Sequence, residues 1–287
     1  MKRIALVTCR EFADLDPDDR LVIPPLTQRG IEAVPAVWDD PAVDWSGFDL
    51  AVLRSPWDYT RRRDEFVQWA AGVPRLLNPA DVVEWNTDKR YLADLAAAGA
   101  PVVPTVYVAP GERWDAPTEG QWVIKPAVSA GSVDTGRYDL ADPSERELAY
   151  ALMQRLHEES RTVMVQPYLD AVDSYGETAL IFIRGQYSHA IRKGPMLDGP
   201  YRGVASLYKR EEIVSREPSL IEREVADTVL AASPFPADQL LYARVDLIGG
   251  PDQPVLVELE VTEPSLFLRY DPKAPERLAD AIAAELG

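Results

Sequence analysis

Apolar and polar positions alternate most regularly in the segment 240–265, where two apolar runs flank a Gly-Gly-Pro-Asp turn at 249–252. This pattern predicts an antiparallel β-hairpin. Because side chains alternate between the two faces of a strand, the apolar residues fall on one face of the hairpin and the charged residues on the other. The charged face carries Arg244, Asp246, Glu258 and Glu260.

The charged face of this hairpin predicts a metal site. A turn centred near Asp252 places Asp246 opposite Glu258, and Arg244 opposite Glu260. Like charges opposed across strands destabilise a sheet, and neighbouring carboxylates cannot all stay ionised without compensation. Mg²⁺ supplies that compensation, since it binds carboxylate oxygens together with substrate phosphates. The alternative is a solvated outer face of a sheet edge; the apolar opposite face, typical of a one-sided core, favours the metal.

The N-terminal part of the chain alternates strand-like and helix-like segments. The expected strands are 4–8, 31–38 and 50–53, and the expected helices are 14–30 and 60–71. This order predicts a small open α/β layer. Pro24 and Pro25 are expected to kink the first helix, which ends at Gly30. No G-x-G-x-x-G motif follows the first strand, so a dinucleotide-binding site lacks its main support.

Ligands of such open sheets bind beyond the carboxyl ends of the strands. The loops 8–11 and 54–59 are therefore candidate substrate loops. The second loop contains Arg54, Trp57, Asp58 and Tyr59.

Two lysines are candidate phosphate ligands. Residues 86–98 predict a helix capped at 86–88 and closed by Gly99, and Lys89 lies in its first turn. A cation there opposes the helix dipole unless it reaches a ligand, so an exposed lysine is the alternative. Lys125 ends a predicted strand at 121–125, directly before a Gly/Ser-rich loop at 128–136. Such a loop can hold phosphate with backbone N–H groups and one charge, although no P-loop motif is present.

The remaining segments predict further elements. Helices are expected at 143–159, 220–232 and 274–286, a strand at 162–167, and a hairpin of strands 177–183 and 186–193. A long Gly/Pro-rich loop at 195–203 follows Arg192 and Lys193 and contains Arg202. Loops of this length in compact domains are usually functional. His189 on a strand and His157 on a helix are more typical of structural residues than of a general base.

Composition narrows the choice of partner and compartment. The 287 residues are 27% charged and 46% hydrophobic, as in globular proteins, and the net charge is −17. That charge disfavours nucleic acid or an anionic membrane surface as a partner. No signal peptide or membrane-spanning segment is evident, so we expect a cytoplasmic protein. The single cysteine, Cys9, fits a small buried hydrophobic residue.

Taken in order, these motifs resemble those of the ATP-grasp superfamily. The resemblance covers roughly 85–270: a lysine on a helix, a lysine before a Gly-rich loop, an acidic linker after a strand, and R-x-D with E-x-E on a hairpin. It implies a mixed α/β (α+β) protein with the ATP-grasp fold. An N-terminal pre-ATP-grasp α/β domain would span 1–85 and the grasp domain 86–287, in which about 105–170 forms the nucleotide lid.

The resemblance also implies roles for individual residues. The ATP ligands would be Lys89, Lys125, Ser129, Gly131, Ser132, Gln166, Tyr168, Leu169 and Asp173, of which Asp173 holds the ribose. Two Mg²⁺ ions would be held by Asp246, Glu258 and Glu260, and the catalytic cations would be Arg244, Lys125 and Arg192. Many members of the superfamily have asparagine in place of Glu260, so we expect tighter metal binding here.

Within the superfamily, the TCRE segment at 8–11, the SPWDY loop at 55–59 and the E-L-E hairpin are most similar to O-ureido-serine cyclo-ligases of cycloserine biosynthesis. This implies ATP-dependent activation of a carboxylate and ring closure of O-ureido-D-serine to D-cycloserine. The substrate, an amino-acid-like carboxylate, would contact Arg54, Trp57, Asp58, Tyr59, Lys193 and Arg202, with Asp58 on its amine. A homodimer is also expected.

Three other functions remain open from the sequence. The first is an intermolecular ATP-dependent amide ligase for an amino acid, the second a nucleotide-binding regulator without turnover, and the third a metal-binding α/β domain without nucleotide. The joint presence of both lysines and all three hairpin carboxylates favours a nucleotide-dependent enzyme.

Overall fold

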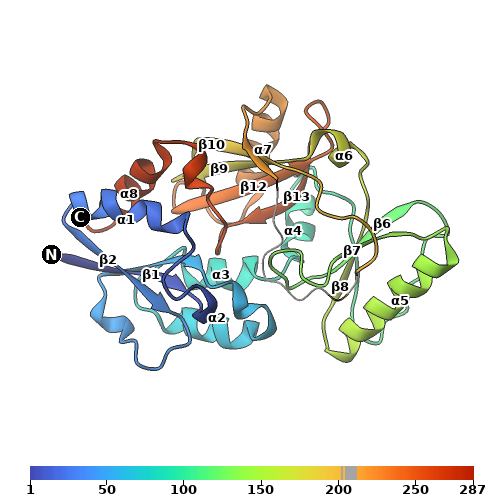
Figure 1. Cartoon of the computed structure of the whole chain (residues 1–287), viewed down its shortest axis with the longest axis horizontal. Coiled ribbons are helices and arrows are strands. Elements are labelled where there is room, and N and C mark those ends of the chain that lie inside the picture. The colour runs from blue at the N-terminus through green and yellow to red at the C-terminus, as the bar shows by residue number, and fades with distance from the viewer. Residues whose placement is uncertain (202, 204–211) are drawn as a thin grey trace.

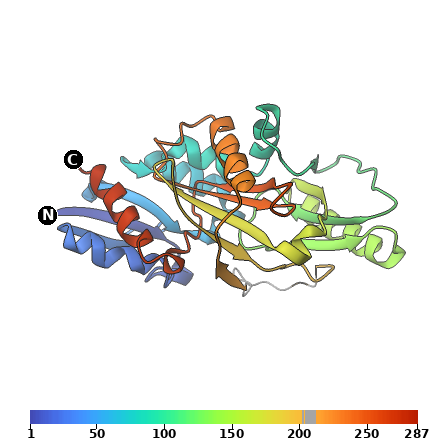
Figure 2. The same ribbon diagram turned by 90° about the horizontal axis from the view of Figure 1, so that it is seen from above.

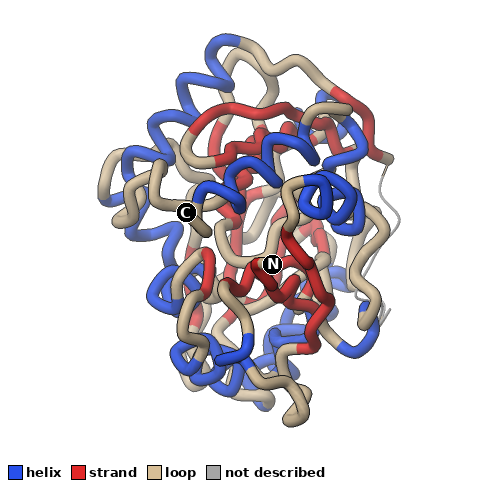
Figure 3. The backbone as a smooth tube through the Cα atoms, turned by 90° about the vertical axis from the view of Figure 1, so that its left-hand side faces the viewer, coloured by secondary structure: helices blue, strands red, loops and turns tan. Residues whose placement is uncertain are grey.

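The strands of the molecule form three sheets that follow one another along its long axis (Figure 1). The computed structural model describes residues 1–201, 203 and 212–287. The two termini lie near each other at one end (Figures 1 and 3). In the part of the chain just specified, no helix is both long and apolar enough to cross a bilayer.

The N-terminal sheet is parallel and has the strand order β2-β1-β3-β4. Its elements are β1 (Lys2–Thr8), β2 (Ile31–Val37), β3 (Leu50–Ser55), β4 (Leu76–Leu77), α1 (Ile23–Gln28), α2 (Arg63–Gly72) and α3 (Ala80–Asn86). The α/β layer predicted for this region is confirmed. The long helix expected at 14–30 is wrong, because a 3₁₀ turn at Asp19–Val22 precedes the six-residue α1. Pro24 and Pro25 occupy the first turn of α1, where a missing N–H breaks no helical hydrogen bond, so they begin the helix instead of kinking it.

The helix expected at 86–98 is confirmed as α4 (Tyr91–Ala97), but it begins later than predicted, because the chain turns between the end of α3 at Asn86 and the start of α4. Asn86 does not cap a helix: its amide donates to the Leu259 carbonyl at 2.7 Å and accepts from the Val261 N–H at 2.9 Å. Lys89 therefore lies in the turn between two helices, where its N–H donates to the Ala127 carbonyl at 2.8 Å.

The central sheet has the strand order β11-β10-β9-β12-β13 and positions the hairpin. Its strands are β9 (Glu177–Ile183), β10 (Gln186–Lys193), β11 (Ile213–Ser215), β12 (Tyr242–Ile248) and β13 (Val255–Glu260). Both predicted hairpins are confirmed, and the pairing of Asp246 with Glu258 and of Arg244 with Glu260 is as expected. Helices α7 (Leu220–Ala232) and α8 (Ala274–Ala284) lie along this sheet, as Figure 2 shows from above.

Each face of the central sheet has its own core. Leu180, Phe182 and Val245 pack on the side of α7, in one cluster with Val229. On the other face, Ile181 belongs to a cluster that includes α8 and β1 residues. The charged residues of β12 share this second face, beyond the apolar cluster, because Arg244 and Asp246 pair with Ile181 and Ala179 of β9. Glu260 and Glu258 of β13 lie on the same face, because they pair with these two β12 residues.

The outer sheet has the strand order β5-β8-β6-β7 and is antiparallel. Its elements are β5 (Val106–Val108), β6 (Gln121–Pro126), β7 (Gly136–Asp139) and β8 (Val163–Pro167), with α5 (Pro143–Glu158) packed against it. A short helix, α6 (Ala171–Tyr175), connects β8 to β9. The predicted strands at 121–125 and 162–167 and the helix at 143–159 are confirmed, and the strand expected directly after Pro104 is β5; the short strand β7 was not predicted.

Candidate active site

A cavity of about 230 Å³ is lined by residues of the central and outer sheets, together with Trp57 and Tyr59 from the 3₁₀ turn that follows β3. Most of the predicted site residues line it: Trp57, Tyr59, Lys89, Lys125, Ser129, Gly131, Ser132, Gln166, Tyr168, Leu169, Lys193, Arg244, Glu258 and Glu260. They come from segments up to about two hundred residues apart in the sequence, and the tertiary structure brings them together.

The floor of the cavity is the charged face of the central sheet. Lys193 pairs with Glu177 across β9 and β10 at 2.6 Å and with Asp246 at 2.8 Å. Arg244 donates to Asp246 at 2.8 Å and also to Glu260. Each hairpin carboxylate that the sequence assigned to metal therefore has a cation beside it within the chain. Burial opposes ionisation of Asp246, but Arg244 and Lys193 outweigh it and hold its pKa below the ordinary value.

Glu258 and Glu260 differ in their electrostatic surroundings. The Glu258 carboxylate pairs with Lys89 at 3.0 Å. Burial opposes its ionisation, but Lys89 and Lys125 outweigh burial, so the pKa of Glu258 is lowered. Burial raises the pKa of Glu260 to about 8, because the nearby Arg244 does not fully offset burial and the charge of Glu258. A further positive charge near Glu260 would therefore stabilise its ionised form.

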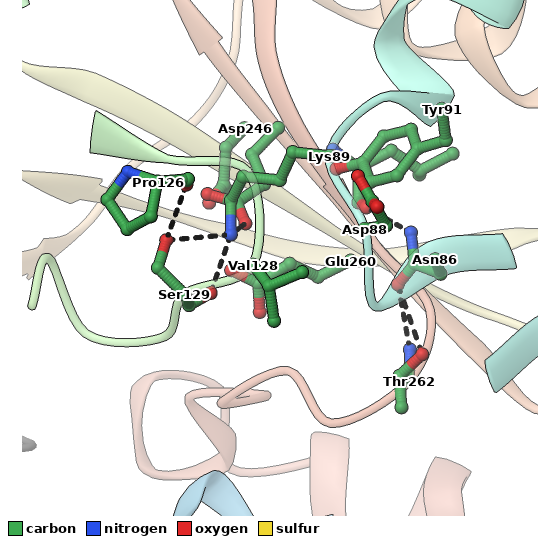
Figure 4. A network of polar contacts seen from close by, with 12 residues as sticks. Asn86, Asp88, Lys89, Tyr91, Pro126, Val128, Ser129, Asp246, Glu260 and Thr262 are labelled. Carbon is green, nitrogen blue, oxygen red and sulfur yellow. Dashed lines mark hydrogen bonds and ion pairs between the residues drawn. The ribbon is translucent and has the colours of Figure 1, made fainter. Parts of the chain in front are cut away.

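Both predicted phosphate lysines line the cavity next to the loop that follows β6. Lys89 Nζ donates to the Ser129 carbonyl at 2.6 Å and to Ser129 Oγ at 3.3 Å (Figure 4). The side chain of Lys125 forms no hydrogen bond or ion pair with any residue the structure describes, although its backbone pairs with β8. Burial, together with the positive charge of Lys89, lowers the pKa of Lys125 despite the attraction of Glu258. A buried cation without an internal partner is ready to receive an anion.

The Gly/Ser-rich loop is anchored from beneath by Asp134. This carboxylate is buried and accepts from Arg155 at 2.8 Å and from Arg161 at 2.6 Å. Gly131, Ser132 and Asp134 all have positive φ, so the loop folds back tightly. Such curvature directs backbone N–H groups to one side, which suits phosphate oxygens.

The predicted nucleotide linker, at the end of β8 beside β6, forms another part of the cavity wall. The Gln166 amide donates to Thr105 Oγ1 at 2.9 Å, and the Tyr168 hydroxyl donates to Asp173 at 2.5 Å. The guanidinium of Arg137 stacks on the Tyr168 ring, 3.8 Å from its centroid. Asp173 lies at the rim, half-exposed, instead of lining the cavity.

Three of the predicted substrate or catalytic residues that the structure describes do not line the cavity. Arg54 is fully buried: its guanidinium donates to Asp19 at 2.7 Å and to the Pro264 carbonyl at 2.9 Å, so it cannot also receive a substrate carboxylate. Asp58 faces away and accepts from Trp38 Nε1 at 2.8 Å.

Arg192, predicted to be catalytic, pairs with Thr178 in the register and so lies on the opposite face from Lys193; its guanidinium donates to the Tyr175 carbonyl at 2.6 Å. Arg202 lies outside the described residues. The loop 8–11 also contributes no residue to the cavity.

Two cavity carboxylates were missed by the sequence reasoning. Glu177 begins β9 on the charged face, opposite Lys193, and its pKa is raised to about 7 by burial despite that lysine. The predicted hairpin of 177–183 and 186–193 already implied this pairing. Glu263 lines the cavity from the segment after β13, where no periodic pattern signalled it.

The residues present fit a magnesium ion in their chemistry. Among the described residues, no three His, Cys, Asp or Glu side chains converge as a ready-made metal cage. The hairpin carboxylates instead hold lysine and arginine. However, Mg²⁺ is usually bound by one or two carboxylates plus substrate phosphates. Burial raises the pKa of Glu260, so a cation bound beside it would stabilise the ionised carboxylate. Glu258 and Glu260 both line the cavity and are placed to supply such oxygens.

Comparison with known proteins shows close relatives over the full length. Residues 4–78 match the family model of the D-cycloserine synthetase DcsG N-terminal domain. The cycloserine biosynthesis protein DcsG of Streptomyces lavendulae is 40% identical, with 99% of this chain and 98% of that protein aligned.

Comparison with solved structures identifies the fold. The crystal structure of D-cycloserine synthetase DcsG has a TM-score of 0.84 and 37% identity, covering 99% of this chain and 100% of the other. The ATP-grasp ligase PsnB, solved with a variant of its minimal precursor, Mg and ADP, has a TM-score of 0.60 and 17% identity, covering 99% and 98%. The mixed α/β fold is therefore the ATP-grasp fold, as the motifs predicted.

Proposed function

The chain belongs to the D-cycloserine synthetase family of ATP-grasp ligases, and from that premise we propose that it closes O-ureido-D-serine to D-cycloserine. The chain is an ATP-dependent ligase, and ATP and magnesium are used generally by ligases of this fold. The observation that carries the proposal is full-length similarity to a cycloserine ligase combined with one cavity lined by the lysines, Arg244 and two hairpin carboxylates.

ATP would enter the cavity between the outer and central sheets. Lys89 and Lys125 supply positive charge for the phosphates, next to the loop that contains Ser129, Gly131 and Ser132. The linker after β8, with Gln166, Tyr168 and Leu169, would bind adenine, and Asp173 at the rim would bind the ribose hydroxyls.

The reaction would proceed in two displacements. The substrate carboxylate attacks the γ-phosphorus and ADP leaves, which gives an acyl phosphate. The oxygen-bonded nitrogen of the ureido group in the same molecule then attacks the acyl carbon, inorganic phosphate leaves and the nitrogen loses its proton to solvent. These displacements give an N-carbamoyl ring. Hydrolysis of the bond between the ring nitrogen and the carbamoyl carbon then gives D-cycloserine and releases carbamate. Arg244 faces the cavity from β12 and would offset the charge of the phosphoryl group in flight. No protein nucleophile is needed.

Magnesium, when bound, would supply electrostatic stabilisation of the phosphoryl charge. Glu258 and Glu260 of β13 would hold it, and Asp246, which pairs with Glu258 from the neighbouring strand β12, would be the third carboxylate. We propose two magnesium ions. Asp246 is held by Lys193 and Arg244, so it can ligate metal only if at least one of these ion pairs yields. The homodimer remains a prediction.

Ring closure gains from its intramolecular nature. The attacking nitrogen and the acyl carbon belong to one substrate, so holding that substrate in a bent conformation replaces a second binding event. Trp57 and Tyr59 on one side and Lys193 on the other bound the substrate end of the cavity.

The test is release of ADP and phosphate from MgATP with O-ureido-D-serine, followed by mass spectrometry of the product. The proposal expects stimulated release and a cyclic product from this one organic substrate. A product that incorporates a second amine would instead identify an intermolecular ligase, and binding of MgATP without any release would identify a regulator.

A further inference from the structure

Charged side chains in the cavity are almost all paired within the chain. The ion pairs are Lys89 with Glu258, Lys193 with Glu177 and Asp246, and Arg244 with Asp246 and Glu260. Within the described part of the chain, two charged cavity residues, Lys125 and Glu263, form no ion pair. One unpaired cation and one unpaired carboxylate thus remain for a ligand.

The two unpaired charges sit on different walls. Lys125 belongs to β6 of the outer sheet, beside the Gly/Ser-rich loop, and so suits a phosphate. Glu263 follows β13 and lies next to Trp57 and Tyr59, which come from the N-terminal layer. An anionic side chain at that end suits a cationic group of the second substrate, not ATP.

Glu263 is held in place by contacts that do not use its carboxylate. Trp57 Nε1 donates to the Glu263 carbonyl at 3.0 Å, and Arg54 donates to the next carbonyl, that of Pro264, at 2.9 Å. The carboxylate itself interacts with the Tyr59 hydroxyl. The segment is therefore positioned before any ligand arrives, which lowers the cost of binding.

The surroundings of this carboxylate strengthen attraction to a cation. Burial raises the pKa of Glu263 to about 7, because Tyr59 and the charge of Lys89 only partly offset burial. Aromatic side chains of Trp57 and Tyr59 border the same space, and an ammonium ion is also attracted to aromatic faces.

We propose that Glu263, assisted by Tyr59, binds the α-ammonium group of the amino-acid substrate and so makes the enzyme select α-amino acids over simple carboxylic acids. This inference rests on the proposed function for the identity of the substrate. It replaces the role that the sequence suggested for Asp58, whose carboxylate accepts from Trp38 and Arg62 away from the cavity.

The experiment measures binding, so that it does not depend on turnover. Isothermal titration calorimetry in the presence of magnesium and a non-hydrolysable ATP analogue compares O-ureido-D-serine with its des-amino analogue, 3-(ureidooxy)propanoate. Glu263→Gln should weaken binding of the amine-bearing compound by about 30-fold, since one partner of a buried charge pair is lost. It should leave binding of the des-amino compound within about twofold, because that ligand has no ammonium to lose.

Two further variants define the effect. Tyr59→Phe removes one hydroxyl and should lower the preference for the amine by about fivefold. Glu147→Gln makes the same chemical change on the exposed surface of α5 and should leave both affinities unchanged. Binding of the ATP analogue alone should match the wild type in all variants, which shows that the nucleotide half is intact.

The outcomes separate this inference from the proposed function. Equal losses for both compounds in Glu263→Gln, or no loss for either, would overturn the role of Glu263. A selective loss for the amine, together with no ADP release by the wild type on O-ureido-D-serine, would support the role of Glu263 and refute the proposed ring closure.

Discussion

The buried ion pair between Arg54 and Asp19 makes a strong prediction about stability. The Arg54 side chain is 0% exposed and that of Asp19 is 3% exposed, and the nearest N–O distance is 2.7 Å. Burial raises the pKa of Asp19 although the charge of Arg54 opposes it, so the pair as a whole gains little over two apolar residues. Removing Arg54 alone is different, because it leaves a buried carboxylate that already has one oxygen without a partner.

We expect Arg54→Met to lower the free energy of unfolding by about 3–5 kcal/mol at pH 7. Asp19→Leu alone should cost a similar amount, since it strands the guanidinium. The double variant should lie within about 2 kcal/mol of the wild type, because neither charge then remains buried. Urea denaturation followed by tryptophan fluorescence measures all four proteins.

The pH dependence of stability provides a second test of the Arg54–Asp19 ion pair. A carboxyl group whose folded pKa lies above its unfolded value destabilises the fold at high pH, and this penalty disappears as the pH falls below the unfolded pKa. The deficit of Arg54→Met should therefore shrink between pH 7 and pH 5. A single variant within about 1 kcal/mol of the wild type, or a double variant as unstable as the sum of the singles, would refute this account of the pair.

The remaining predictions concern the cavity and its loop. Glu258→Gln should lower kcat, measured by ADP release, by about 10²–10³-fold and should leave the melting temperature nearly unchanged. Glu224→Gln on the exposed side of α7 is the matched control. An unchanged rate in Glu258→Gln would remove Glu258 from the catalytic residues. Lys125→Met should weaken ATP binding by about tenfold or more. It should also raise the melting temperature of the ligand-free protein, because a buried cation without an ion pair is removed. A lower melting temperature would show that the Lys125 side chain has an internal partner. Asp134→Asn should destabilise the fold by about 1–3 kcal/mol at pH 7, because Arg161 and Arg155 outweigh burial and hold the pKa of Asp134 below its ordinary value. A carboxyl group with a depressed folded pKa stabilises the fold above its unfolded pKa and loses this contribution as the pH falls through the folded pKa. The difference in the free energy of unfolding between Asp134→Asn and the wild type, measured by urea titration, should therefore be smaller at pH 3 than at pH 7. A difference that does not change with pH would contradict this prediction.

Local patterns sufficed where the relevant interactions are themselves local. The β12–β13 register followed from a period of two residues on either side of a Gly-Gly-Pro-Asp turn. The helix expected at 220–232 is α7, and in the structure it begins with a capping box formed by Ser219 and Glu222. The order of lysines, loop and hairpin was also enough to indicate ATP-grasp motifs, because these residues recur at fixed places along the chain.

Helix boundaries failed where a polar side chain had a distant partner. Asn86 looked like a helix cap, since its side chain could satisfy free N–H groups nearby. In the structure its amide bonds to backbone groups of Leu259 and Val261 in and just after β13, a contact that a sequence window around position 86 does not contain.

The chain by itself determined which faces of its strands are charged and which are apolar, because that depends only on the alternation of side chains along each strand. Only the tertiary structure decided which charged side chains form ion pairs with one another. Arg54 is neutralised by Asp19 and does not line the cavity, while the Glu263 carboxylate forms no ion pair with any described residue. Ion pairing depends on distances of a few ångström between segments far apart in sequence, and burial then sets how much each unpaired charge costs.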